Sequence, residues 1–176
     1  QSLPKQKRKF ILFLGASMCN FSSSEAIDFL KEVQYNLLPE DYLFIGFDLK
    51  KEPEIILNAY NDKKGITKQF NLNLLERINR EMGANFNTNN FEHSPYYDVE
   101  QGEARSVLIS NRSQMIEIPA LETLIHFKKN EPLNTEISKK YSFEEIGILA
   151  EETGFEVVQN LTDYKRYFTN SIWRKK

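Results

Sequence analysis

Two apolar runs near the start of the chain place the strongest constraint on its fold. Residues 10–15 read FILFLG and residues 42–48 read YLFIGFD, so each run ends at a small or polar residue. Continuous apolar runs are typical of strands that are covered on both faces of a parallel sheet. We therefore expect two parallel strands, the first of them central in its sheet.

The segment between these runs has the signature of a crossover helix. Ser22 and Glu25 have the spacing of a capping box, and apolar residues then recur at helical intervals. The sequence Pro-Glu-Asp at residues 39–41 interrupts this pattern. A strand, a helix and a strand in this order predict a right-handed crossover unit.

The middle of the chain changes character and predicts an inserted unit. Residues 53–61 and 65–82 have the apolar spacing of helices. Beyond them, four segments alternate like the strands of a small antiparallel sheet: residues 91–97, 104–111, 114–118 and 123–128. Four apolar residues of the second helix are expected in the core: Phe70, Leu72, Leu74 and Leu75.

The end of the chain again has the helix and strand pattern of an α/β fold. Ser142 and Glu145 repeat the capping-box spacing, and a strand over residues 155–161 and a hairpin reaching Trp173 follow. We expect an α/β fold whose core comprises residues 1–52 and 135–176, with an α+β subdomain inserted at residues 53–134.

Composition argues against several classes of partner. The 23 basic and 25 acidic side chains give a formal charge of -2, without the basic excess that binding to nucleic-acid phosphates requires. No apolar run approaches the roughly 20 residues that cross a bilayer, and the basic stretch at residues 1–9 lacks the apolar core of a signal peptide. One cysteine and two histidines do not suggest a zinc site. We expect a cytoplasmic protein without a membrane, nucleic-acid or metal partner.

Five short motifs, taken in order, resemble one known family. They are FLGASMCNF at residues 13–21, AYND at 59–62, FNLNLL at 70–75, NRE at 79–81 and TEIS at 135–138. Their order and spacing are similar to those of the histidine-specific Nα-methyltransferases of ergothioneine biosynthesis, which use S-adenosylmethionine (SAM). The resemblance spans nearly the whole chain. It implies the C-terminal half of a class I, Rossmann-like methyltransferase sheet that carries an inserted substrate-binding subdomain.

The resemblance also implies a site for an amino acid. Gly15 and Asn20 stand where the family contacts the α-amino and α-carboxylate groups of its substrate. Tyr60 corresponds to the family's tyrosine on the same carboxylate, while Glu136 and Ser138 correspond to the pair that holds the imidazole side chain. We expect no dedicated general base, because a free α-amine has a pKa of about 7.7 to 8.0 and is partly neutral in the cytosol.

Each of these residues also has a plain structural interpretation. Asn20 follows a predicted strand and could form a turn or cap a helix. Tyr60 could be an amphipathic surface residue. Glu136 and Ser138 alternate with Ile137 and could form the solvent side of a strand.

Two features depart from the family's pattern. Cys19 stands where the family usually has glycine, which would reshape the loop before Asn20; with no histidine nearby in sequence, we expect this thiol to be a small buried filler. The family's glycine-rich turn, its acidic residue for the SAM ribose and its N-terminal substrate tyrosines have no counterpart. We therefore expect a missing N-terminal SAM-binding segment, or a second chain, to complete the protein.

The leading hypothesis is a part of a SAM-dependent enzyme that methylates the α-amino group of histidine or a related amino acid and is inactive in isolation. The alternative is a non-catalytic amino-acid-binding or interaction domain that kept the pocket without donor binding. A sheet edge left unpaired would favour pairing with another chain or with an additional segment. Both hypotheses require the polar residues named above to converge on one cavity.

Overall fold

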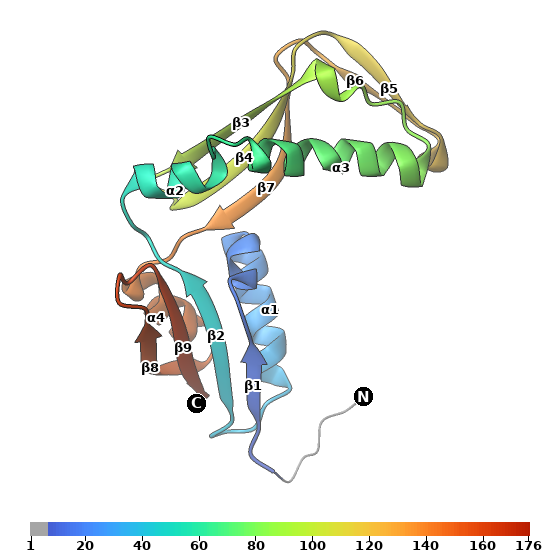
Figure 1. The fold of residues 1–176 in the computed structure, drawn as a ribbon. Helices are drawn as coiled ribbons and strands as arrows, with labels where there is room; N and C mark the ends of the chain where they lie inside the picture. Colours follow the sequence, from blue (N-terminus) through green and yellow to red (C-terminus); the bar gives the residue numbers. More distant parts are fainter. Residues whose placement is uncertain (1–6) are drawn as a thin grey trace. The chain divides into compact units, whose positions relative to one another are not determined.

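The computed structural model describes residues 7–176, which divide into two compact units. Residues 7–51 and Ser138–Lys176 form the first unit, and Glu52–Ile137 form the second. The basic stretch predicted at residues 1–9 falls largely on residues 1–6, which lie outside the described residues. Figure 1 shows the elements of each unit, coloured along the sequence.

The first unit is built on a mixed sheet of four strands in the order β1-β2-β9-β8. The strands are β1 (Phe10–Phe13), β2 (Tyr42–Asp48), β8 (Phe155–Thr162) and β9 (Phe168–Lys175), and the helices are α1 (Ser23–Tyr35) and α4 (Phe143–Glu152). β1 and β2 are parallel, and β9 runs antiparallel to β2 and β8. The predicted α/β class is confirmed: the unit has a Rossmann-like sheet with a parallel pair, a connecting helix and a closing hairpin.

Both helices of the first unit begin at the capping boxes that the sequence predicts. The Ser22 N–H donates to Glu25 Oε2 at 2.8 Å, and the Glu25 N–H donates back to Ser22 Oγ at 3.4 Å. Ser142 and Glu145 form the same pair of bonds at 2.6 and 3.1 Å. These bonds satisfy amides that the first turn of a helix leaves unpaired, so local sequence fixes both helix starts.

One face of this sheet packs against α1 and α4. Leu43, Ile45 and Phe47 occupy alternate positions of β2 and are fully buried in one core, which also contains Leu30 of α1. The Phe47 ring stacks on Trp173 of β9, with 5.7 Å between the ring centroids. Because successive strand residues point to opposite faces, only every second residue of β2 can enter this core.

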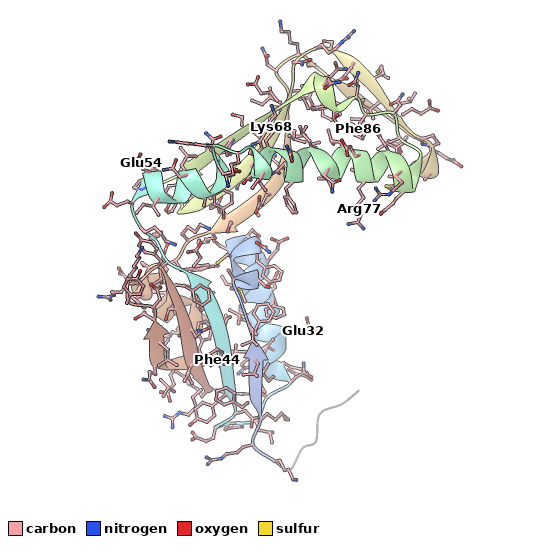
Figure 2. The ribbon with its side chains drawn as sticks, viewed as in Figure 1. Glu32, Phe44, Glu54, Lys68, Arg77 and Phe86 are labelled. Carbon is pink, nitrogen blue, oxygen red and sulfur yellow. The ribbon has the colours of Figure 1, made fainter. Side chains whose placement is uncertain are left out.

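The opposite face of the sheet is exposed at β1, so the expectation that the first strand is central and buried on both sides is wrong. Within the described residues β1 lies at the edge of its sheet, and Phe10, Leu12 and Leu14 are 53%, 59% and 60% exposed. Phe44 of β2, labelled in Figure 2, lies beside Phe10 with 6.2 Å between ring centroids. We call these four residues the open face. The apolar run does form a strand, but in the described residues helices cover only one of its sides.

The second unit contains the middle of the chain. Its helices are α2 (Pro53–Tyr60), α3 (Ile66–Met82) and the short 3-10 turns η2 (Thr88–Asn90) and η3 (Pro119–Leu121). Its strands are β3 (Phe91–Asp98), β4 (Glu103–Ser110), β5 (Gln114–Ile118), β6 (Thr123–Phe127) and β7 (Pro132–Lys139), of which the last two β7 residues are assigned to the first unit. The predicted helices and alternating strands are confirmed.

The strands of this unit form two sheets where the sequence predicted one. β3, β4 and β7 make a three-stranded sheet, and β5 pairs with β6 in a separate hairpin. Of β7, only the stretch from Glu136 to Ser138 was anticipated, as the plain structural interpretation of those residues, because the strand carries no apolar run and begins with Pro132. A proline is tolerated at the first position of a strand at a sheet edge, which is where β7 lies.

The buried stripe of α3 is narrower than the sequence predicted. Leu75 is fully buried and Asn71 is 3% exposed, whereas Phe70 is 69% exposed and Leu74 is 38% exposed. Residues four apart share one face of a helix, so Asn71 and Leu75 face the core while Phe70 and Leu74 face away from it. The expectation that Phe70 and Leu74 belong to the core is therefore wrong.

Gly46 supports the close approach of β2 to the turn after β1. A Cβ at this position would overlap the Gly15 carbonyl oxygen and lie 2.7 Å from Cζ of Phe168. We expect Gly46→Ala to lower the free energy of unfolding by about 1 to 3 kcal/mol, measured by urea denaturation, because the strand must move to admit the methyl group.

Gly147→Ala is the matched control for this substitution. Gly147 lies inside α4, and no atom would approach its added Cβ within 4 Å. Alanine there is expected to leave stability unchanged or to raise it by roughly 0.5 to 1 kcal/mol, because glycine is a poor helix former. Equal urea midpoints for the two variants would contradict the packing described around Gly46.

Candidate functional site

The turn after β1 carries two of the predicted site residues. Gly15 has φ +75°, a left-handed conformation that favours glycine, and it directs the chain into the 3-10 turn η1 (Ser17–Asn20). Asn20 is the last residue of η1, and its side chain is exposed. The turn therefore presents an amide side chain to solvent beside the carboxyl end of β1.

Buried residues of η1 anchor this turn to β2. Met18 and Cys19 are both 0% exposed, and the Asp48 N–H donates to Cys19 Sγ at 3.4 Å. Burial raises the pKa of the Cys19 thiol, an effect that the bond from the Asp48 amide partly offsets. Cys19 is thus a buried filler, as the sequence predicted, and not an activated nucleophile.

A charged cluster lies where β2 ends. The two carboxylate oxygens of Asp48 contact Lys140 Nζ at 2.7 Å and Lys51 Nζ at 2.5 Å. Lys140 Nζ also donates to Ser138 Oγ at 2.8 Å. The Lys140 and Ser138 residues are buried, at 2% and 7% exposure, so the interpretation of Ser138 as the solvent side of a strand is wrong.

In the second unit, Tyr60 and Glu136 line one open groove of about 390 Å³. Tyr60 is the last residue of α2 and Glu136 lies on β7, and both are half-buried. The fully buried Ser106 donates its Oγ–H to Glu136 Oε2 at 3.4 Å. The groove thus combines a phenol with a carboxylate that is held from the β4 side.

Phe70, which was expected in the core, lines this groove instead. Its ring is exposed on α3, one helical turn after Ile66, which lines the same groove. The sequence signal that could have indicated a role at the site is the position of Phe70 in the family-like motif at residues 70–75. An exposed aromatic ring beside Tyr60 and Glu136 offers an apolar contact for a ligand side chain.

Asp62 fixes the connection between α2 and α3, which carries much of the groove wall. Its carboxylate oxygens accept the N–H groups of Ile66 at 3.0 Å and Thr67 at 2.8 Å. These backbone bonds at a helix N-terminus lower the pKa of Asp62 to about 2. The carboxylate therefore holds the start of α3 next to Tyr60.

The five predicted residues fall into two sets. Gly15, Asn20 and Ser138 belong to the first unit, where Ser138 is joined to η1 through Lys140, Asp48 and Cys19. Tyr60 and Glu136 belong to the second unit, which brings them into one groove. The convergence of the two sets on a single ligand remains a prediction.

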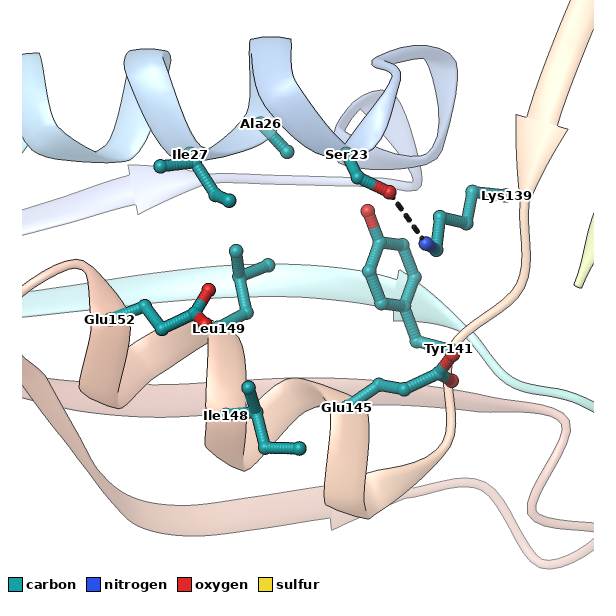
Figure 3. Close-up of a pocket in the computed structure, with 9 residues that line it drawn as sticks. All are labelled: Ser23, Ala26, Ile27, Lys139, Tyr141, Glu145, Ile148, Leu149 and Glu152. Atoms are coloured by element: carbon teal, nitrogen blue, oxygen red, sulfur yellow. Dashed lines mark hydrogen bonds between the residues drawn. The ribbon is translucent and has the colours of Figure 1, made fainter. Parts of the chain in front are cut away.

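A separate hollow of about 160 Å³ lies on the helix-covered side of the first unit (Figure 3). Apolar residues of α1 and α4 form much of its wall, and Lys139 Nζ donates to Ser23 Oγ at 2.8 Å at one end. None of the five predicted residues lines it. We assign it no function.

Across residues 7–176, no three histidine, cysteine, aspartate or glutamate side chains are grouped so that they could hold a metal ion. None of the helices described in this part of the chain combines the length and apolar character needed to cross a bilayer.

Comparison with known proteins connects these features to one family. Residues 1–175 match the family model described as histidine-specific methyltransferase, SAM-dependent. Histidine N-alpha-methyltransferase of Mycolicibacterium smegmatis is 30% identical over 161 residues, which cover 92% of this chain and 50% of that protein. Ergothioneine biosynthesis protein 1 of Neurospora crassa is 35% identical over 164 residues, which cover 92% of this chain and 18% of that protein.

The chain therefore spans half or less of the length of these two relatives. Among solved structures, a S-adenosylmethionine-dependent methyltransferase from Clostridium acetobutylicum matches with a TM-score of 0.43 and 9% identity, over 99% of this chain and 61% of that one. This structural likeness is too distant to inform the function.

The depressed pKa of Asp62 predicts a defined dependence of stability on pH. The folded-state pKa of about 2 lies below the ordinary value of 3.8, so the stabilisation is complete above 3.8 and is lost as the pH falls through about 2. We expect Asp62→Asn to lower the melting temperature at pH 7 and to have little effect near pH 2.

The carboxyl carbon of Asp62, followed by NMR, gives a direct measurement. Its titration midpoint is expected near 2 in the folded protein and near the ordinary aspartate value in the urea-unfolded chain. A folded-state midpoint close to 3.8 would show that the amide bonds to Ile66 and Thr67 do not form.

Proposed function

Because the chain belongs to the family of SAM-dependent, histidine-specific methyltransferases, we propose that it forms the amino-acid-binding part of an enzyme that methylates the α-amino group of histidine or a closely related amino acid. The structural observation that carries the proposal is the groove shared by Tyr60 and Glu136, which lie far apart in the sequence. A phenol and a carboxylate in one groove suit a ligand that has both a carboxylate and a polar ring.

The side chains suit the two ends of such a ligand. The Asn20 amide and the Tyr60 phenol can donate hydrogen bonds to a carboxylate without placing a full positive charge beside a cationic methyl donor. Glu136 can accept a hydrogen bond from an imidazole N–H, and a bond to an ionised carboxylate is stronger than one between neutral groups. Together they would orient the amino acid by both of its ends.

Methyl transfer to an amine makes modest demands on the protein. The nitrogen must be unprotonated and held about 3 to 3.5 Å from the methyl carbon, so positioning supplies most of the rate enhancement. A fraction of a free α-amine is already neutral at cytosolic pH, because its pKa is about 7.7 to 8.0. We therefore assign binding roles to Asn20, Tyr60, Glu136 and Ser138 and propose no general base.

The family uses SAM, which supplies an electrophilic methyl group when it is bound. We propose that the SAM site lies outside residues 7–176, because the seven glycines of the sequence are too widely spaced for the glycine-rich turn that cradles a nucleotide-like ligand. We assign no residue of this chain to SAM.

The open face of the first unit supports a role for additional protein in completing the enzyme. Large apolar side chains lie exposed beside the unpaired edge of β1, and such surfaces are typical of interfaces. Since the matched regions cover only 50% and 18% of the two relatives named above, we propose that another segment of the full-length gene product covers this face and supplies the SAM site. The chain alone would then be inactive.

Binding measurements on the full-length gene product test the proposal. We expect the wild type to bind L-histidine and SAM in calorimetry, and Glu136→Gln to raise the KM for histidine about 10-fold or more through loss of a charge-assisted hydrogen bond. Glu117→Gln is the control, because Glu117 is an exposed glutamate on β5. A wild-type protein that binds neither ligand would refute the proposal.

Methyltransferase activity, measured for the full-length gene product and for residues 1–176, distinguishes an enzyme from a binding domain. The full-length product is expected to methylate histidine, whereas residues 1–176 alone are expected to transfer no methyl group. Binding of histidine by a full-length product that transfers no methyl group would instead identify a non-catalytic amino-acid-binding domain.

A further inference from the structure

The first unit contains a buried ammonium group that the proposed reaction does not use directly. Lys140 follows β7, its side chain is 2% exposed, and its Nζ lies 2.7 Å from Asp48 Oδ2. Burying a charge is costly unless the charge is paired and hydrogen-bonded, and Asp48 provides that compensation. This buried lysine also contacts Ser138, a predicted ligand-binding residue, so its charge can influence how Ser138 binds a ligand.

The chemistry of the ammonium group fixes the polarity of its bond to Ser138. An ammonium has three donors and no acceptor, so Ser138 Oγ must accept the 2.8 Å hydrogen bond from Lys140 Nζ. Within the described residues, Lys140 is the hydrogen-bond partner of this hydroxyl. This bond occupies one of the two lone pairs of Ser138 Oγ and places a positive charge beside the hydroxyl, which favours the hydroxyl as a donor, not an acceptor, toward a ligand N–H.

Glu136 supplies the opposite polarity two residues earlier on the same strand. An ionised glutamate can only accept hydrogen bonds, and residues two apart on a strand project from the same face. A neutral imidazole offers one N–H donor and one acceptor nitrogen. An acceptor at Glu136 and a fixed donor at Ser138 therefore match the neutral ring, whereas an imidazolium carries N–H groups on both nitrogens.

We propose that Lys140, paired with Asp48, is a positioning residue that holds the Ser138 hydroxyl as a hydrogen-bond donor, so that the side-chain pocket accepts histidine with a neutral ring. The inference rests on the proposed function, because it takes Glu136 and Ser138 as the residues that contact the imidazole. It adds the origin of the pocket's polarity, which neither residue sets by itself.

The pH dependence of histidine affinity in the full-length gene product tests this proposal. An imidazole with a pKa near 6.5 is about nine-tenths neutral at pH 7.5 and about one-tenth neutral at pH 5.5, so wild-type affinity measured by calorimetry is expected to fall about 10-fold between them. Equal wild-type affinity at the two pH values overturns the proposal, whatever the substituted proteins do.

Lys140→Met separates positioning from a purely structural role. Without the ammonium, Ser138 can turn its lone pairs toward a protonated ring, so the change in affinity between pH 7.5 and 5.5 is expected to shrink below about 3-fold. A lysine that only stabilises the fold would leave this ratio as it is in the wild type. An unchanged ratio therefore overturns the proposal, even if the affinity falls at both pH values.

Two further variants control the experiment. Asp48→Asn combined with Lys140→Met removes both members of the ion pair, so the ratio can be measured without a carboxylate that has lost its buried partner and keeps only Lys51. Lys139→Met removes the neighbouring lysine, which contacts Ser23, and should keep the wild-type ratio. Within the first unit, the charged and titratable groups near the Lys140–Ser138 pair are Asp48, Lys51 and Cys19, and Lys140→Met retains all three.

Failure of the proposed function has a different signature. If the wild type binds no histidine at either pH, the assignment of this chain to an amino-acid site is lost together with the role of Lys140. If histidine binds and Glu136→Gln weakens binding while Lys140→Met leaves the pH ratio unchanged, the proposed function stands and only the role of Lys140 is overturned.

Discussion

Burial of one face of β2 is the constraint on which the first unit depends. Leu43, Ile45 and Phe47 enter the core beneath α1 and α4, so the intervening residues must point the other way. Gly46, on that other face, admits the carbonyl group of the turn after β1, and Asp48 emerges where the strand ends. The position of the polar cluster is thus a consequence of strand alternation, as expected for residues at the carboxyl ends of parallel strands.

Local signals predicted most of the elements. The capping boxes at Ser22 and Ser142 act within a few residues, and the structure has the helices that they predict. The burial of β1 could not be obtained in the same way, because an apolar run does not reveal which neighbours cover its second face. Most of β7 escaped prediction for a related reason: the strand pairs with β4, while its sequence carries only the isolated apolar residues Leu133 and Ile137 after Pro132.

The candidate site was predictable in its residue types but not in its supports. The resemblance pointed to Tyr60 and Glu136, which the second unit places in one groove. Lys140 carried no such signal, since adjacent lysines before a helix usually lie in solvent, and only the fold shows that one of them is buried against Asp48. Phe70 gave the opposite error, because helical spacing alone does not distinguish a core stripe from a groove lining.

The burial of Cys19 makes its thiol a natural probe of local opening in the first unit. The thiol is the only one in the sequence, it is fully buried, and its sulfur accepts the amide of Asp48. A modifying reagent can reach it only when η1 separates from the end of β2, and such local openings occur well below the energy of global unfolding. The rate of thiol labelling therefore measures how often the loop beside Asn20 detaches, without an engineered probe.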